Sequence, residues 1–195
     1  MKMSKIEKQL VNSPSHSQQV SNHADDLLQL VDFEAGQTYV DVGCGNGAAP
    51  IHIAKKYHLE ATGIDVDPDQ IRQAETLSQG LKNVRFLTID GVQLPFDDNE
   101  FDIVSTNKVM HHIPDWEMAL AEMVRVLKPN GYLIYSDLIF PGWIAALGKL
   151  TIKNYAGFPT GKTLDTFVEQ NHLSKTHLSK SLLSYEAVLQ KNSIS

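Results

Sequence analysis

Residues 41–47 read Asp-Val-Gly-Cys-Gly-Asn-Gly; a β-prone run over 38–42 leads into them, and residues 48–57 place apolar side chains at helical spacing. Glycines at such a junction let the backbone take positive φ angles and approach a ligand closely. The helix that follows presents free amide groups at its N-terminus. The strand, glycine-rich turn and helix together predict a ligand site at one edge of an α/β sheet.

Strands and helices alternate on the C-terminal side of this turn. Further β-prone runs cover 60–65, 84–89, 101–106 and 132–138, and helical patterns start at Pro68 and Trp116. Such alternation is typical of βαβ units in a mostly parallel sheet. The last two β-prone runs, 173–178 and 183–189, are too close in sequence for a crossover helix, so we expect an antiparallel hairpin. The predicted fold is α/β, a Rossmann-like three-layer sandwich with a seven-stranded, mostly parallel sheet and a C-terminal antiparallel hairpin.

Local sequence also predicts where two helices begin. Asp67 is a suitable N-cap, Pro68 fits the first helical position, and Gln70 completes a capping-box pattern. Near the N-terminus, residues 12–19 are rich in Ser, Gln and His. We therefore expect residues 1–23 to be a mobile arm, with a short helix starting near Ala24 and a single domain over 24–195.

The composition is that of one ordinary globular domain. The chain has 195 residues, of which 42% are hydrophobic and 21% charged, and its formal net charge is −6. A negative charge argues against nucleic acid as a partner. The single cysteine, Cys44, allows neither an internal disulfide nor a cysteine-rich zinc site, so we expect no metal and a cytoplasmic location. No apolar run approaches the roughly 20 residues that span a bilayer, so we expect no membrane partner. We also expect the protein to be a monomer or a homodimer.

Two acidic residues at strand ends narrow the choice of ligand. Asp41 lies in a strand that should be buried, where a carboxylate is costly unless it is paired. It suits a ligand with a cationic head and would repel a pyrophosphate; alternatively, it caps a loop amide. Asp65 is placed to accept hydrogen bonds from ribose hydroxyls. Gly43, Gly45 and Ala48 also fit the dinucleotide-binding pattern, so a nicotinamide-dependent reductase is an alternative.

An ordered set of motifs resembles one family, the type-11 small-molecule methyltransferases of class I. The matching segments are 41–47, Asp65, 89–91 with 94–96, 101–104, 111–115 and 125–131. The family usually ends the last segment with Gly-Gly, where this chain has Asn130-Gly131; Asn tolerates left-handed backbone angles, so the departure is mild. The resemblance implies an enzyme that uses S-adenosylmethionine and releases S-adenosylhomocysteine.

The resemblance implies that the glycine-rich turn wraps the amino-acid part of this cofactor. The residues concerned are Gly43, Cys44, Gly45, Asn46 and Gly47.

Further matching residues would bind the rest of the cofactor. By resemblance, Asp65 would hold the ribose and Val66 would flank the adenine. Asp90 would accept a hydrogen bond from the adenine amine, with Gly91 beside it. Asn107 would line the methionine end through its backbone.

The acceptor side of the site is less defined by sequence. Transfer from a sulfonium needs a base only when the acceptor arrives protonated. The candidate base is His112, with His111 behind it, although His112 could instead cap or pack against the next helix. Residues 107–110 lack the Asn/Asp-Pro-Pro-aromatic motif of nucleic-acid amino methylation, so we expect a small-molecule acceptor with an O, N or C nucleophile. A cofactor-binding protein without catalysis is the remaining alternative.

The connection after the fifth strand is unusually apolar. Residues 140–162 include Phe140, Trp143, Ile144, Leu147, Tyr155 and Phe158. We expect this segment and the N-terminal arm to form the acceptor pocket and close over it. The alternative is a helix packed on the sheet or a dimer surface.

Overall fold

The computed structural model describes residues 12–151 and 158–193 of the chain. The elements, in chain order, are α2 (Pro14–Leu28), β1 (Thr38–Val42), α3 (Ala48–Tyr57), β2 (Glu60–Asp65), α4 (Pro68–Leu77), β3 (Val84–Thr88), β4 (Phe101–Asn107), the 3-10 helix η1 (Met110–His112), α5 (Trp116–Val126), β5 (Leu127–Leu138), α6 (Gly142–Thr151), α7 (Gly161–Gln170), β6 (Leu173–Lys180) and β7 (Ser184–Lys191).

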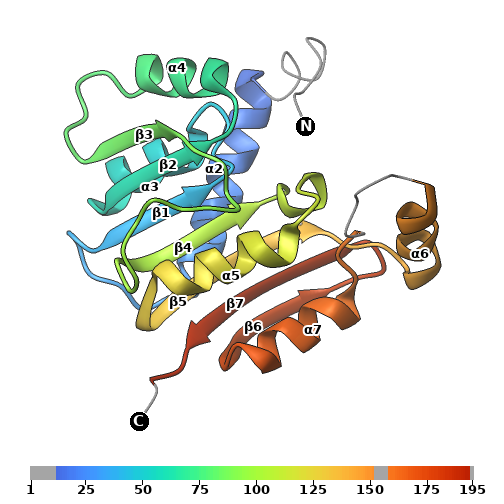
Figure 1. Ribbon diagram of the computed structural model, residues 1–195. Helices are drawn as coiled ribbons and strands as arrows, with labels where there is room; N and C mark the ends of the chain where they lie inside the picture. Colours follow the sequence, from blue (N-terminus) through green and yellow to red (C-terminus); the bar gives the residue numbers. More distant parts are fainter. Residues whose placement is uncertain (1–11, 152–157, 194–195) are drawn as a thin grey trace.

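The strands form one seven-stranded sheet in the order β3-β2-β1-β4-β5-β7-β6. Strands β1 to β5 are parallel to one another, β7 is antiparallel to β5, and β6 is antiparallel to β7. Figure 1 shows α5 and α7 in front of the sheet and α2 behind it. The predicted fold class is therefore confirmed, including the C-terminal antiparallel hairpin.

Side chains alternate between two apolar layers, as the pleat of a strand requires. Tyr39 and Ile103 pack with Leu27 and Leu28 of α2 on one face. Val40 and Val104 belong to the larger cluster on the other face, under α5 and α7. Both faces of the central strands are thus buried, which leaves the strand ends as the place where polar groups are accessible.

The N-terminal prediction needs correction. Residues 14–23 are the first turns of α2, whereas we expected a mobile arm up to residue 23. Ser13 caps the helix by accepting from the His16 amide, and Pro14 lies in the first turn. Ser17 and Ser21 then bond to Asn46 and the Ala48 carbonyl, so α2 lies against the glycine-rich turn. Residues 1–11 of the expected arm lie outside the described residues.

The predicted capping box at α4 is wrong. Asp67 caps the helix by accepting from the Asp69 amide, but Gln70 does not reach back to the cap. Its side chain is 1% exposed, and neither amide atom has a hydrogen-bond partner within the described part of the chain. The Gln70 side chain is therefore packed on the buried side of α4, whereas the motif predicts that it bonds to the backbone at the start of the helix.

Other boundaries also differ from the prediction. β4 extends to Asn107, and β5 begins at Leu127, so the expected turn over 128–131 is an irregular start of that strand. The apolar connection 140–162 contains α6 and the first residues of α7. Thr160 and Thr163 form a capping box there. Tyr155 of the expected pocket lies outside the described residues.

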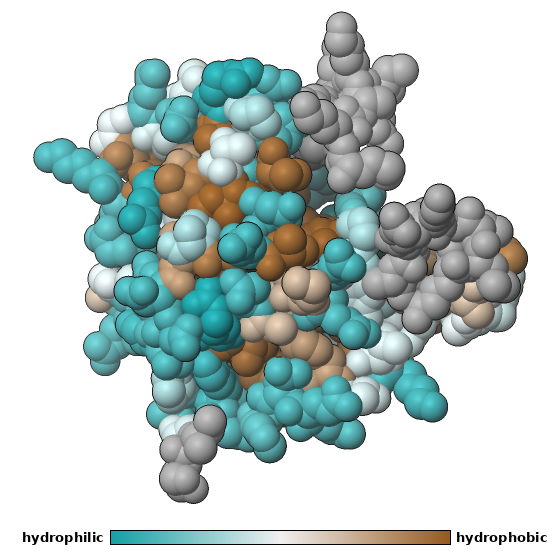
Figure 2. All heavy atoms as spheres, in the orientation of Figure 1, coloured by the Kyte–Doolittle hydropathy of each residue, from teal (hydrophilic) through white to brown (hydrophobic). Residues whose placement is uncertain are grey.

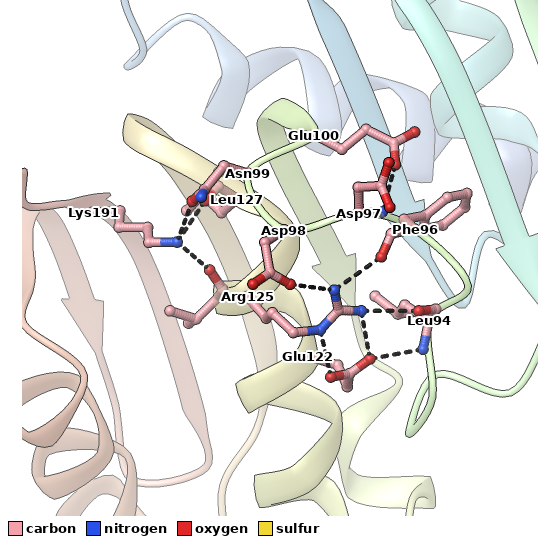
Figure 3. Close-up of polar contacts among 11 residues, drawn as sticks. Leu94, Phe96, Asp97, Asp98, Asn99, Glu100, Glu122, Arg125, Leu127 and Lys191 are labelled. Carbon is pink, nitrogen blue, oxygen red and sulfur yellow. Dashed lines mark hydrogen bonds and ion pairs between the residues drawn. The ribbon is translucent and has the colours of Figure 1, made fainter.

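Figure 3 shows why the 125–131 motif matters for the fold. The Arg125 guanidinium donates to Glu122 and Asp98 and to the carbonyls of Leu94 and Phe96. These bonds tie α5 to the connection that leads into β4. Leu94, Phe96 and Asp98 directly precede β4, so Arg125 bonds to them at the amino edge of the sheet, away from the glycine-rich turn.

Candidate functional site

The glycine-rich turn crosses the end of β2. The amides of Gly43 and Cys44 both donate to the Ile64 carbonyl, at 2.8 and 2.9 Å. Gly43, Gly45 and Gly47 have φ angles of 81°, 54° and 79°, which side chains rarely adopt. A Cβ on Gly43 would clash with Val109, whereas one on Gly45 would meet nothing within 4 Å. The turn therefore leaves open space over Gly45, as a bound ligand requires.

Asp65, at the end of β2, is oriented by this turn. Its two carboxylate oxygens accept from the Gly45 amide at 2.9 Å and from the Asp67 amide at 2.8 Å. A carboxylate has about four acceptor sites, so it can accept further hydrogen bonds in this fixed position. The hydrogen bond from Gly45 thereby fixes the glycine-rich turn to Asp65, the residue predicted to bind the ribose.

Asp41 is 5% exposed and lies on the face of the sheet that α2 covers. Its Oδ1 accepts from Ser105 Oγ at 2.7 Å, and Ser105 Oγ lies 2.6 Å from the Tyr39 hydroxyl. Burial raises the pKa of Asp41 to about 6, the Ser105 bond opposes that shift, and the charge of Asp65 adds to it. A cationic ligand group beside Asp41 would offset the cost of its charge.

Two residues of the turn use their side chains for the fold. The Cys44 thiol is buried in the cluster with Phe86 and Ala74, and burial raises its pKa. Asn46 donates from Nδ2 to Ser17 Oγ at 3.0 Å, which anchors α2. Only the backbone of these two residues is available to a ligand over the turn.

The predicted adenine end contains an exposed apolar side chain. Val66 is 56% exposed and directly follows Asp65. The adenine of the cofactor is expected to pack on this side chain. Asp90 is exposed, and its Oδ1 accepts from the Val92 amide. A Cβ on the buried Gly91 would lie 3.1 Å from the Val42 side chain, so a larger residue fits there only if Val42 shifts.

At the end of β4, Asn107 is within the strand and pairs with Ser136 of β5. Its Oδ1 is buried and has no hydrogen-bond partner among the described residues. Lys108 follows with a φ angle of 56°, and its amide donates to the Ser136 carbonyl at 2.7 Å. The left-handed turn ends the strand beside the glycine-rich turn, where the methionine end of the cofactor is expected.

The two histidines after β4 lie differently from what the sequence suggests. His111 Nδ1 lies 2.5 Å from Asp137 Oδ1, and the Asp137 side chain is fully buried. Asp137 Oδ2 also accepts from the Met110 amide at 2.6 Å. His112 is exposed and lies against His111, with ring centroids 3.9 Å apart. The oriented imidazole is thus that of His111, and sequence analysis missed its partner Asp137.

A third histidine reaches the same strand end from the other face. His23 of α2 lies 3.0 Å from Ser136 Oγ and 3.3 Å from Glu186 Oε2 of β7. Ser136 and Asp137 are consecutive, so their side chains leave β5 on opposite faces. The carboxyl end of β5 therefore holds His23 on one side and His111 on the other.

Known proteins with similar sequences and structures identify the family. Residues 40–135 match the family model of a methyltransferase domain. The chain belongs to the class I, S-adenosylmethionine-dependent methyltransferases. This confirms the family that the motifs predicted. In the part of the chain that the structure describes, five parallel strands precede the antiparallel hairpin, which argues against the nicotinamide-dependent reductase.

The chain is 30% identical to methyltransferase GfsG of Streptomyces halstedii over 144 residues, 72% of this chain and 52% of that protein. It is 31% identical to ajmaline N-methyltransferase of Rauvolfia serpentina over 137 residues, 63% of this chain and 47% of that one. The chain thus spans about half the length of these curated relatives. The structure of a methyltransferase from Aquifex aeolicus matches with a TM-score of 0.73 at 19% identity, covering 97% of this chain and 100% of that chain. At this identity the match shows a shared fold and nothing further.

Among residues 12–151 and 158–193, no helix is long and apolar enough to cross a membrane. Within the same residues, no group of three His, Cys, Asp or Glu side chains is arranged to hold a metal ion.

Proposed function

We propose that this protein transfers the methyl group of S-adenosylmethionine to a hydroxyl or amine of a small-molecule acceptor, with His111 as the general base. The observation that carries the proposal is the 2.5 Å contact between His111 Nδ1 and the buried carboxylate of Asp137. An imidazole held in this way has a fixed tautomer and orientation, as a base requires. It replaces His112, the residue that sequence favours.

The residues around the glycine-rich turn fit the cofactor. The open space over Gly45 would take its amino-acid part, Asp65 its ribose, and Val66 with Asp90 and Gly91 its adenine. The unpartnered Oδ1 of Asn107 lies at the expected methionine end. When bound, the sulfonium supplies an already activated methyl group, so positioning accounts for much of the acceleration.

The residues of this chain would then manage the acceptor's proton. Asp137 lies against Nδ1 of His111, and we propose that the imidazole takes the proton from an O–H or N–H acceptor at Nε2. Because the Asp137 carboxylate is buried, it also stabilises the imidazolium that results. A carbon or already deprotonated nucleophile would not need this step.

The test is release of S-adenosylhomocysteine from S-adenosylmethionine with a panel of phenols, alcohols and amines. With a responding acceptor, His111→Gln should lower kcat by roughly 10²–10⁴-fold, the usual range for a lost general base. His112→Gln should stay close to the unmodified protein, and Asp137→Asn should fall between the two. Affinity for S-adenosylhomocysteine, measured by calorimetry, should be the same in all three variants.

Two outcomes would contradict parts of the proposal. Binding of S-adenosylmethionine without turnover on any acceptor would favour the cofactor-binding protein that sequence left open. Full turnover in His111→Gln would show that the acceptor loses its proton elsewhere.

Asp65→Ala tests the cofactor site separately and should weaken binding of S-adenosylmethionine by roughly 1–3 kcal/mol, as expected for lost charge-assisted hydrogen bonds.

A further inference from the structure

Polar side chains form a row across the carboxyl ends of three neighbouring strands. Asn107 of β4 lies opposite Ser136 of β5, which in turn lies opposite Glu186 of β7. One step further into the sheet, Ile134 and Val188 are buried in the apolar cluster under α2. Residues two apart in a strand point to the same face, as do residues opposite each other on neighbouring strands. The three residues, which we name the polar row, therefore lie on the α2 face.

His23 of α2 reaches the polar row from the helix layer. Its Nε2 lies 3.0 Å from Ser136 Oγ and 3.3 Å from Glu186 Oε2. The side chains of His23 and Glu186 remain 33% and 27% exposed, so a ligand in solution can reach both of them. These contacts join His23 to the polar row in one accessible site.

The polar row adjoins the part of the site where the methionine end of the cofactor is expected. Asn107 is the member of the row assigned to that end, and its buried Oδ1 has no hydrogen-bond partner among the described residues. Glu186 lies two strands further along the sheet, which corresponds to roughly 10 Å. A small molecule bound at Glu186 could therefore extend to the methyl group of the cofactor.

α2 is attached to the domain at several other places. Leu27 and Leu28 are buried in the core, Asp25 bonds to side chains of α3, and Ser17 bonds to Asn46. A polar contact as accessible to water as that of His23 with Glu186 contributes little to stability. Attachment of the helix is therefore a weak explanation for the polar row.

The charges of the site indicate a cationic ligand. Glu186 is a largely buried carboxylate, and among the described residues neither lysine nor arginine pairs with it. Ser136 and Asn107 add oxygen atoms without positive charge. An ammonium group supplies three hydrogen-bond donors and the charge that this set of acceptors lacks. A phosphate or a carboxylate would be repelled by Glu186.

We propose that His23 and Glu186 form a subsite that anchors the methyl acceptor and selects small molecules with a basic amine. The inference rests on the proposed function and narrows it to a substrate class. The ammonium group would bind to the Glu186 carboxylate, while His23 lies against the same carboxylate and Ser136. Because an ammonium has no free electron pair, it serves as the anchor, and another group of the molecule receives the methyl group.

The test is calorimetry of amine binding to the protein saturated with S-adenosylhomocysteine, so that the cofactor site is filled and no turnover is needed. Tyramine, phenethylamine and hexylamine are each compared with the alcohol of similar shape, namely tyrosol, phenethyl alcohol and hexanol. At least one amine should bind about tenfold or more tightly than its alcohol, because only the ammonium pairs with Glu186. Added salt should reduce that difference.

Substitutions of Glu186 separate recognition from structure. Glu186→Gln should remove the preference for amines and leave the affinity for S-adenosylhomocysteine unchanged, because the amide can still bond to His23 but carries no charge. Glu186→Asp keeps the charge and should keep part of the preference. A merely structural contact would not show this dependence on charge.

Glu169→Gln is the matched control, because it removes the same charge from another part of the surface. Glu169 is exposed near the end of α7, on the face of the sheet opposite α2 (Figure 1). Hydrophilic side chains predominate along the lower rim of that face (Figure 2). This variant should bind amines as the unmodified protein does, and unchanged melting temperatures would establish that the variants fold.

Equal binding of every amine and its alcohol would overturn the inference, as would an amine preference that survives in Glu186→Gln. A loss of S-adenosylhomocysteine affinity in Glu186→Gln would assign the polar row to the cofactor instead. Failure of the proposed function looks different. Amine-selective binding without turnover on any acceptor would reject the methylation and leave the subsite, whereas turnover of neutral acceptors without amine preference would do the reverse.

Discussion

Asp41 is the residue at which cofactor binding and pH should be coupled. Its pKa is raised to about 6, chiefly by burial. A cofactor with ammonium and sulfonium groups favours the ionised carboxylate. Affinity for S-adenosylmethionine should therefore rise as the pH increases from about 5 to 7, with release of a proton on binding near pH 6. Calorimetry in buffers of different ionisation enthalpy measures both quantities.

Asp41→Asn should abolish this pH dependence and weaken binding at pH 7. Equal pH dependence in the variant would assign the coupling to another group.

Gln70 is a residue at which the native sequence is not the most stable one. Its buried amide has no partner in the described part of the chain, and an unsatisfied buried polar group costs about 1–3 kcal/mol. Gln70→Met keeps a similar shape without the amide and should raise the free energy of unfolding by about 1 kcal/mol. Urea unfolding measures this change. A loss of stability would mean that the amide is bonded outside the described residues.

At the scale of elements, one carboxylate of α2 bonds to three side chains of α3, in addition to the apolar packing between the two helices. Asp25 accepts from Lys56, from Tyr57 and, at 3.1 Å, from His52, all on α3. The Lys56 bond, with help from Tyr57 and His52, holds the pKa of Asp25 well below its usual range. Asp25→Ala should loosen α2, which also contacts the glycine-rich turn through Ser17.

Hydrogen exchange over residues 14–28 should therefore become faster in Asp25→Ala, while exchange in β4 and β5 stays unchanged. Gln29→Ala is the control, because Gln29 bonds to Asp25 from within the same segment and does not reach α3. Faster exchange in that control as well would indicate a general loss of stability.

The elements differ in how far sequence determines them. β1 and α3 follow the predicted bounds, because periodic apolar residues and the glycine-rich turn define both locally. α2 was missed over residues 14–23, since its polar surface gives a weak periodic signal and its partners, such as Asn46, come later in the chain.

The candidate site shows the same limit. The glycine-rich turn and Asp65 were predictable, because their chemistry follows from strand ends and helix starts. The choice between His111 and His112 was not, because it depends on Asp137, 26 residues further along the chain on β5. Neighbours in sequence cannot reveal which of them faces a distant carboxylate.

At the scale of the whole molecule, several carboxylates set the response to acid. Bonds from Arg125 hold the pKa of Glu122 low. Burial raises the pKa of Asp165, but bonds from Lys175, Lys180 and Tyr185 outweigh it, so that its pKa is about 2. A depressed pKa gives stability that is present above the unfolded value near 4 and is lost as the pH falls toward 2.

Asp41 acts with the opposite sign, because its raised pKa costs stability as the pH rises from about 4 to 6. The free energy of unfolding should therefore fall steeply below pH 4. Asp165→Asn should make this fall shallower in urea unfolding at a series of pH values. An unchanged acid limb would show that Asp165 is not a determinant of acid stability.

The lone thiol of the chain lies beneath the turn on which the cofactor is expected to rest. Cys44 is 7% exposed, and its Sγ would lie 2.9 Å from a Cβ on Gly63, so an alkylating reagent cannot reach it while the turn is closed. Alkylation therefore needs a local opening, whose frequency the labelling rate reports. The alkylation rate of Cys44 is thus a built-in measure of how often the turn opens. A ligand bound over the turn should lower that rate without any change in global unfolding.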